Sequence, residues 1–306
     1  MSTTEQFVTD GGLETDLIYN RGFDLPDFAA FPLVEDDRGR HVMTEYYDEY
    51  AAIAARAGVG LRLESPTWRA SPDWAAGLGY DATRLAAVNR ASIDFVRSVG
   101  ERWTDRVGAI EVSGQIGPRG DGYRPGAAVD PDEAAEYHRP QIAAFAEAGA
   151  DVATALTLTD TGEALGVVAA ARDVGIPVAI SFTVETNGKL PTGKSLMEAI
   201  AVVDADGGPD YFFVNCAHPE HVERGLGIDG FWRDRVHGLR VNASTRSHEE
   251  LDAMTELDAG DPTLLAAAHA RLERSLPGVR VIGGCCGTDA RHVAALWRDR
   301  SRAAAV

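Results

Sequence analysis

The chain has 306 residues, of which 45% are hydrophobic and 25% are charged, and this ordinary globular composition excludes a largely disordered protein. Its 29 basic and 47 acidic residues give a net charge of −18 without a basic run, which argues against a nucleic-acid partner. The first ten residues lack the basic and apolar regions of a signal peptide, and no apolar run approaches the roughly 18 residues of a membrane span. We therefore expect a cytoplasmic protein without a membrane partner.

Short β-branched apolar runs alternate with amphipathic helical patterns along the chain. Gly, Pro or Asp flanks each run, as is typical of buried parallel strands. In chain order, the eight predicted strands cover Phe7–Thr9, Gly60–Leu63, Val107–Val112, Asp151–Ala155, Pro177–Phe182, Tyr211–Val214, Leu239–Asn242 and Val279–Ile282. The predicted helices cover Tyr46–Ala57, Ala82–Val99, Pro131–Ala148, Thr161–Val174, Ser195–Ala205, Thr263–Leu276 and Asp289–Arg300.

This alternation of strands and helices predicts an α/β protein with a parallel sheet. Eight strands in 306 residues favour a closed (β/α)₈ TIM barrel, whose active site lies at the carboxyl ends of its strands. We expect one domain over residues 1–306, because no linker or repeat interrupts the pattern. The alternative is an open doubly wound sheet, but Asp10-Gly11-Gly12-Leu13 after the first strand lacks the G-x-G-x-x-G of a nucleotide-binding turn.

The three cysteines of the chain follow the ends of two predicted strands. Cys216 comes after the sixth strand, and Cys285 and Cys286 come after the eighth. Because every strand of a barrel ends at the same mouth, we expect the three thiols to converge there. Three thiolates that leave a fourth position open form a catalytic zinc site, so we predict zinc bound by Cys216, Cys285 and Cys286. Two alternatives remain, namely buried structural cysteines and a vicinal redox pair.

Five motifs connect the sequence with a known family. They are Asp10-Gly11-Gly12-Leu13-Glu14-Thr15, Thr67-Trp68-Arg69-Ala70-Ser71, Gly114-Gln115-Ile116-Gly117-Pro118, Asn215-Cys216 and Gly283-Gly284-Cys285-Cys286-Gly287. In this order, and over nearly the whole chain, they resemble the homocysteine S-methyltransferase family. The combination of Gly-Gly-Cys-Cys with the earlier Asn-Cys is the specific part of this resemblance.

The resemblance implies a zinc-dependent barrel enzyme that moves a methyl group from a sulfonium or ammonium donor to the thiol of homocysteine and makes methionine. It also implies that the zinc ligands are Cys216, Cys285 and Cys286, that Asp10, Gly11 and Gly12 bind homocysteine, that Asp10 acts in catalysis and that Asn215 supports the site. We expect S-methylmethionine or S-adenosylmethionine as the donor, with a betaine-like donor or a different thiol acceptor as the alternative. The expected partners are these small molecules, and the sequence leaves a homo-oligomer open.

Two positions depart from the family pattern. Leu156 stands after the fourth strand, where the family usually has a glutamate that contacts the amino group of homocysteine. Pro66 stands after the second strand, where the family tends to have Thr-Asn-Thr. We predict that Glu185 or Glu64, which follow the fifth and second strands, replaces the missing amino-group partner. The alternative is that the thiol acceptor is not homocysteine.

One rival pattern favours a different function. Residues Gly188 to Ser195 match G-x-x-x-x-G-K-S, the P-loop of nucleotide-binding proteins. Residues 183–187 separate this pattern from the fifth strand, whereas a P-loop turns directly from a strand into a helix. We therefore favour a loop over the substrate cavity, with Ser195 as the cap of the next helix. A zinc-binding regulator without enzymatic activity is a further alternative on the same fold.

Other side chains near the predicted mouth are candidates for supporting roles. His218-Pro219-Glu220-His221 predicts a surface turn that begins a helix, because proline favours the first helical position. Trp68 and Tyr123 lie in the loops after the second and third strands. They are candidates for an aromatic surface that binds a cationic methyl donor.

Overall fold

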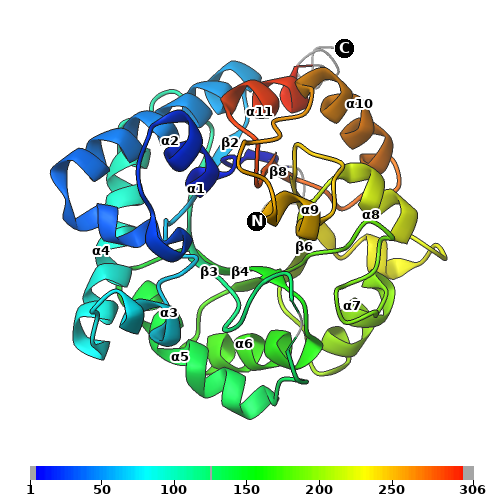
Figure 1. The fold of residues 1–306 in the computed structure, drawn as a ribbon, viewed down its shortest axis with the longest axis horizontal. Coiled ribbons are helices and arrows are strands. Elements are labelled where there is room, and N and C mark those ends of the chain that lie inside the picture. Colours follow the sequence, from blue (N-terminus) through cyan, green and yellow to red (C-terminus); the bar gives the residue numbers. More distant parts are fainter. Residues whose placement is uncertain (1–4, 125, 299–306) are drawn as a thin grey trace.

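The structure, a computed structural model, describes residues 5–298 apart from residue 125. Eight parallel strands pair in chain order and close into a barrel, with β1 bonded to β8, and a ring of helices surrounds them (Figure 1). The strands span β1 (Phe7–Val8), β2 (Gly60–Glu64), β3 (Ile110–Ile116), β4 (Val152–Leu158), β5 (Val178–Phe182), β6 (Tyr211–Ala217), β7 (Val236–Val241) and β8 (Val281–Gly284). The predicted single-domain (β/α)₈ barrel is confirmed, and the open doubly wound alternative is wrong.

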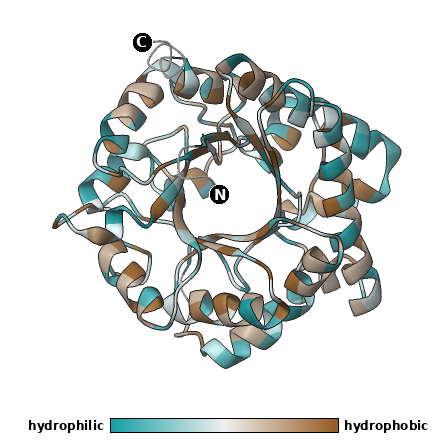
Figure 2. Ribbon diagram, turned by 180° about the vertical axis from the view of Figure 1, so that it is seen from behind, coloured by the Kyte–Doolittle hydropathy of each residue, from teal (hydrophilic) through white to brown (hydrophobic). Residues whose placement is uncertain are grey.

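The helices cover the outside of the barrel. They span α1 (Leu13–Thr15), α2 (Asp37–Ala57), α3 (Pro72–Gly77), α4 (Ala82–Glu101), α5 (Pro131–Glu147), α6 (Thr161–Val174), α7 (Leu196–Ala205), α8 (Pro219–Gly225), α9 (His248–Asp252), α10 (Pro262–Glu273) and α11 (Ala290–Trp297). Figure 2 shows hydrophobic and hydrophilic residues alternating along the helices of the ring, as expected for amphipathic helices that pack on a barrel. Within the described part of the chain, none of these helices has the length and apolar character needed to cross a membrane.

Helix α6 has the predicted bounds, and the other six predicted helices are present with shifted ends. The sequence missed α1, α3, α8 and α9, which have seven residues or fewer and are too short for a clear helical periodicity. Strand β7 begins before its predicted start, because His237 and Gly238 interrupt the apolar run. Asp299 and Arg300, which we assigned to the last helix, lie outside the described residues.

Side-chain caps define the starts of several helices. Asp130, Asp160 and Asp261 each accept hydrogen bonds from backbone N–H groups in the first turn of the helix that follows. Ser195 forms a capping box with Glu198 at the start of α7. Such caps contribute about 1 kcal/mol each, and they anchor the loops that lead from the strands into the helices. A helix begins at Pro219 as expected, with His218 as its cap, but His218 and His221 are both buried, so the predicted surface position is wrong.

The P-loop pattern forms a hairpin. Lys189 and Ser195 pair as an antiparallel bridge, and the backbone N–H of Leu190 donates to the carbonyl of Lys194 at 2.9 Å. This hairpin differs from the direct strand-to-helix turn of a P-loop, so the nucleotide-binding alternative is wrong. The predicted role as a loop over the cavity is also wrong, because none of residues 188–195 lines the cavity described below.

A charged network occupies part of the barrel interior. Arg62 on β2 is fully buried, and its Nε donates to Oε1 of Glu64 at 2.9 Å. Its Nη1 lies 3.1 Å from Oε2 of Glu111 and donates to the hydroxyl of Tyr211 at 2.8 Å. Arg62 and Glu64 are two residues apart on one strand, so their side chains share one face of the sheet. The guanidinium is therefore the counter-charge for two carboxylates inside the barrel.

Candidate active site

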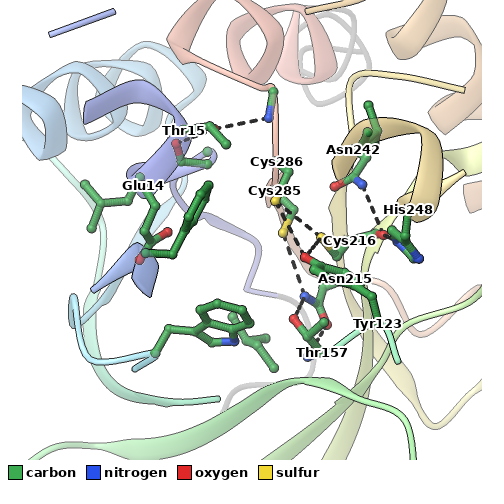
Figure 3. Close-up of a pocket in the computed structure, with 18 of the residues that line it drawn as sticks. Glu14, Thr15, Tyr123, Thr157, Asn215, Cys216, Asn242, His248, Cys285 and Cys286 are labelled. Carbon is green, nitrogen blue, oxygen red and sulfur yellow. Dashed lines mark hydrogen bonds between the residues drawn. The ribbon is translucent and has the colours of Figure 1, made fainter. Parts of the chain in front are cut away.

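The three cysteines meet at the mouth of the barrel. Their Sγ atoms all lie within 4.8 Å of one another, and the Sγ atoms of Cys216 and Cys286 are 3.5 Å apart. Cys216 lies in β6 and is buried, whereas Cys285 and Cys286 follow β8 and are half-buried (Figure 3). The predicted convergence of the three thiols is confirmed, and a cluster of this kind can hold a metal ion.

Two local features of the backbone bring the thiols together. Cys216 has a φ of 55°, in the left-handed region, at a shift in the pairing of β6 with β7. Such an irregularity turns a side chain away from its regular direction in the strand. A Cβ on Gly283 would lie 2.5 Å from the carbonyl oxygen of Asp10, and one on Gly284 would lie 1.9 Å from Oγ1 of Thr288. The end of β8 therefore requires glycine, because it approaches its neighbours too closely for a side chain.

Protons are shared unevenly among the thiols. Hydrogen bonds from Cys285 and Cys286 lower the pKa of the Cys216 thiol well below its usual range. The hydrogen bonds with Cys216 raise the pKa of the Cys285 and Cys286 thiols. The thiolate is the form of cysteine that binds a metal. The two neighbouring thiols therefore stabilise a thiolate at Cys216.

His248, the first residue of α9, and Tyr123, in the loop after β3, contact Cys216 at the mouth. His248 Nε2 is 2.7 Å from the carbonyl oxygen of Cys216, and its Nδ1 is 3.0 Å from Oε1 of Glu185. The hydroxyl of Tyr123 lies 2.9 Å from the Sγ of Cys216, and its ring packs against His248 with 4.4 Å between the centroids. Burial opposes a charge on His248, but its interactions with Cys216 and Glu185 outweigh burial and raise its pKa to about 10. His248 therefore carries a positive charge beside the thiols.

Asn215 connects the cysteine cluster to strands β4 and β5. Its Oδ1 accepts from the backbone N–H of Thr157 at 2.7 Å and from the hydroxyl of Ser181 at 2.6 Å. Its Nδ2 donates to Oγ1 of Thr157 at 2.8 Å and faces the Sγ of Cys285 at 3.8 Å. Both acceptor positions of Oδ1 and both N–H groups of Nδ2 are therefore directed at residues around the cluster. This arrangement agrees with the supporting role that we expect for Asn215.

A cavity of about 310 Å³ opens beside the cysteines. Trp68, Tyr123 and Leu156 form part of its wall. Trp68 and Tyr123 are the two aromatic residues that we expected near the mouth. Most of the predicted site residues also line it, namely Asp10, Gly11, Gly12, Asn215, Cys216, Cys285 and Cys286. Residues of β6 and of the loops after β1 and β8, which are far apart in sequence, therefore share one site at the carboxyl ends of the strands.

A buried ion pair holds Asp10 at the cavity wall. Its Oδ1 lies 2.6 Å from Nη1 of Arg240, and the hydroxyl of Tyr46 donates to its Oδ2 at 3.1 Å. A Cβ on Gly11 or Gly12 would come within 2.6 Å of neighbouring atoms. The segment from Asp10 to Gly12 can therefore lie directly against the loop that carries Cys285 and Cys286.

Neither predicted replacement for the missing family glutamate lines the cavity. Glu64 is fully buried and paired with Arg62, since its place on β2 directs it into the barrel. Glu185 pairs with His248 behind the cysteine cluster. The structure therefore does not bring Glu64 or Glu185 to the cavity in which we expect the acceptor.

Glu14 is an acidic residue that does lie in the cavity. It belongs to α1 and is half-buried in the cavity wall (Figure 3). The pKa of its carboxyl is raised to about 7, mainly by burial and also by the charge of Asp10, against the lowering effect of a backbone hydrogen bond and of the Arg240 and Arg69 guanidinium groups. Glu14 lies within the Asp10–Thr15 motif, but the direction of its side chain depends on α1, which the sequence did not predict.

The fold and the cluster define a (β/α)₈ barrel with a three-cysteine site at its mouth. The family model for homocysteine S-methyltransferase matches residues 7–299, and the chain belongs to this family. It is 28% identical over 307 residues to the homocysteine S-methyltransferase of Escherichia coli (strain K12), over 94% of this chain and 93% of the relative. It is 26% identical to the homocysteine S-methyltransferase YbgG of Bacillus subtilis (strain 168), over 96% and 94% of the two chains. The crystal structure of the metallated homocysteine methyltransferase MmuM from Escherichia coli has the same fold, with a TM-score of 0.75 at 23% identity over 96% of both chains.

Proposed function

We propose that this protein is a zinc-dependent S-methyltransferase that transfers a methyl group from S-methylmethionine or S-adenosylmethionine to homocysteine and makes methionine. The observation that carries the proposal is the cluster of three cysteine sulfurs on the wall of a cavity, in a chain of this family. Three thiolates suit zinc, and they leave a fourth position for the sulfur of the acceptor. Because these thiols must stay reduced, we also propose a cytoplasmic location.

The reaction needs a sulfur nucleophile in line with a methyl carbon. When bound, zinc would supply the positive charge that keeps the acceptor thiol ionised at neutral pH. The acceptor sulfur forms a bond to the methyl carbon while the bond from that carbon to the donor sulfur breaks, and the electron pair of the broken bond neutralises the sulfonium. No general acid is needed for this neutral leaving group. The main task of the protein is therefore to hold both substrates in line.

We assign the binding of the acceptor to the segment from Asp10 to Glu14. The Glu14 carboxylate faces the cavity and suits the ammonium group of homocysteine, a role that the family usually gives to a glutamate where this chain has Leu156. Asp10 is already neutralised by Arg240, so its role is to position the segment and to limit the positive charge near the acceptor. Trp68 and Tyr123 offer aromatic faces to a cationic donor.

Replacing Asn215 with alanine is expected to weaken zinc binding by about 10- to 100-fold, because residues that orient metal ligands commonly contribute that much. Competition with a chromophoric chelator measures this affinity. Asn89→Ala is the matched control, since Asn89 is equally buried but bonds to the carbonyls of Ala70 and Leu85. Equal zinc affinity in the Asn215 variant and the wild type would contradict the supporting role.

The KM for homocysteine is expected to rise about tenfold as the pH falls from 8 to 6. The Glu14 carboxyl has a pKa of about 7, so it is mostly ionised at pH 8 and mostly protonated at pH 6, where it no longer attracts an ammonium group. Initial rates across this range measure the effect. Glu14→Gln should show a high KM at every pH, and a variant with the same pH profile as the wild type would rule out Glu14 as the titrating group.

A donor panel tests the proposed function. Protein stripped of metal with a chelator and then reloaded with zinc is incubated with homocysteine and each of S-methylmethionine, S-adenosylmethionine and a betaine, and methionine is measured. We expect methionine from a sulfonium donor in the zinc-loaded protein and at least a hundredfold less in the stripped protein. Full activity after complete removal of the metal would refute the proposal.

A further inference from the structure

We propose that Arg69 binds the carboxylate of an amino-acid substrate and thereby selects substrates that carry one. This inference rests on the proposed function, because it concerns the substrates of the same cavity. Arg69 follows β2 and lines the cavity together with Glu14 and Tyr123.

The Arg69 guanidinium is packed among aromatic rings. Its Cζ lies 4.0 Å from the ring centroid of Trp68 and 3.6 Å from that of Trp74. Only 8% of the residue is exposed. Contacts between a guanidinium and aromatic faces fix the plane of the group and leave its edge for hydrogen bonds. Arg69 is therefore held rigidly with its N–H donors directed along that edge.

Among the residues that the structure describes, none of opposite charge is in direct contact with the Arg69 guanidinium. Its single hydrogen bond to the described residues runs from Nη1 to the carbonyl of Gly120 at a long 3.4 Å, and its buried Nε has no acceptor. The other guanidinium of the cavity, that of Arg240, pairs with Asp10 at 2.6 Å. A buried charge without a partner is costly, and burial lowers the pKa of Arg69. A ligand anion would complete this site.

The surroundings identify the class of anion. Arg69 lies near the carboxylates of Glu14, Asp27 and Asp121, none of which forms an ion pair with it. These negative charges oppose a dianion such as a phosphate ester, but they suit a molecule that carries both a carboxylate and a cationic group. An α-amino acid has this combination. A carboxylate also matches the planar fork of guanidinium donors. Both homocysteine and S-methylmethionine meet this description.

Two pairs of substrates distinguish the source of the carboxylate. The first pair is homocysteine and 3-aminopropane-1-thiol, and the second is S-methylmethionine and trimethylsulfonium, so that one member of each pair lacks the carboxylate. We expect Arg69→Gln to raise the KM of one carboxylate-bearing substrate by about 10- to 100-fold, because a charge-assisted hydrogen bond to its carboxylate is lost. The KM of the analogue that lacks the carboxylate should stay unchanged. The pair that shows this selective loss identifies the substrate that Arg69 binds.

Two further variants control the experiment. Arg106→Gln removes a guanidinium that stacks on Trp103 at 3.9 Å but does not line the cavity, and it should leave all four KM values unchanged. Arg69→Lys keeps the charge without the fork and should show a smaller selective loss. It also serves as the test variant if thermal melting shows that Arg69→Gln is unfolded. Equal changes in KM for both members of each pair would overturn the proposal and leave Arg69 with a packing role.

A binding measurement separates this inference from the proposed function. The fluorescence of Trp68 and Trp74 reports binding next to Arg69 without any need for turnover. If no donor yields methionine, the proposed function fails. In that case, a carboxylate-dependent fluorescence change that disappears in the Arg69 variants would still support the inference, and equal titrations in wild type and variants would overturn it.

Discussion

Serine in place of Cys216 is expected to remove the bound metal and to lower kcat/KM for methionine formation by more than about 100-fold, beyond the loss typical of residues that only orient a ligand. Serine preserves the size of the side chain, but its hydroxyl stays protonated at neutral pH and binds zinc poorly. Cys216 is also the thiol whose pKa its two neighbours lower, so the substitution removes the prepared ligand. Elemental analysis for zinc and an activity assay on the same preparation measure both effects.

The matched control for Cys216→Ser is His237→Gln. His237 is a side chain of metal-binding type, but it stacks on Tyr211 with 5.2 Å between the ring centroids and does not line the cavity. This variant should keep one zinc per chain and nearly full activity. A Cys216→Ser protein with the zinc content and kcat/KM of the wild type would contradict the assignment of the metal site.

Replacing Arg62 with methionine is expected to lower the free energy of unfolding by about 3–5 kcal/mol, because removal of one partner leaves buried charges without compensation. Arg62 contacts Oε1 of Glu64 and Oε2 of Glu111, and the buried Oε2 of Glu64 has no hydrogen-bond partner among the described residues. Burial raises the pKa of Glu111, and Arg62 lowers it. Urea denaturation measures the change.

The effect of Arg62→Met is expected to grow as the pH rises from 6 to 8. Without Arg62, burial raises the pKa of the Glu111 carboxyl further, so this group holds its proton more tightly in the folded state than in the unfolded chain, and a higher pH favours the unfolded state. Arg90→Met is the control, because Arg90 pairs with Glu147 at an exposed position and should contribute at most about 1 kcal/mol. An Arg62 variant as stable as this control would show that the interior network does not stabilise the barrel.

The order of the strands could be predicted because a buried parallel strand needs a nearly continuous apolar run. This rule located all eight strands, including Tyr211–Ala217, whose run YFFV is unmistakable. It failed at the start of β7, because His237 is polar and Gly238 has no side chain. The backbone pairing nevertheless continues through these residues. Apolar runs identify buried side chains, whereas hydrogen bonding of the backbone determines where a strand begins and ends.

The cysteine cluster could be predicted because it depends on the backbone, whereas the rest of the cavity wall depends on side-chain direction. The strand ends bring Cys216, Cys285 and Cys286 to one mouth. Glu64 also stands at a strand end, but the alternation of side chains along β2 sends it inward to Arg62. Glu14 faces the cavity because of a helix of three residues that has no signal in the sequence.

The position of the cysteines also has a consequence for the biosynthesis of the protein. Two of the three thiols follow β8, the last strand to be translated, and the glycines of β8 let it lie against the loop after β1. A nascent chain that ends before β8 has one cysteine and an open sheet. The pairing of β8 with β1, which closes the barrel, therefore also brings the second and third thiols to Cys216. A site that needs all three thiols therefore exists only in a chain whose barrel is closed.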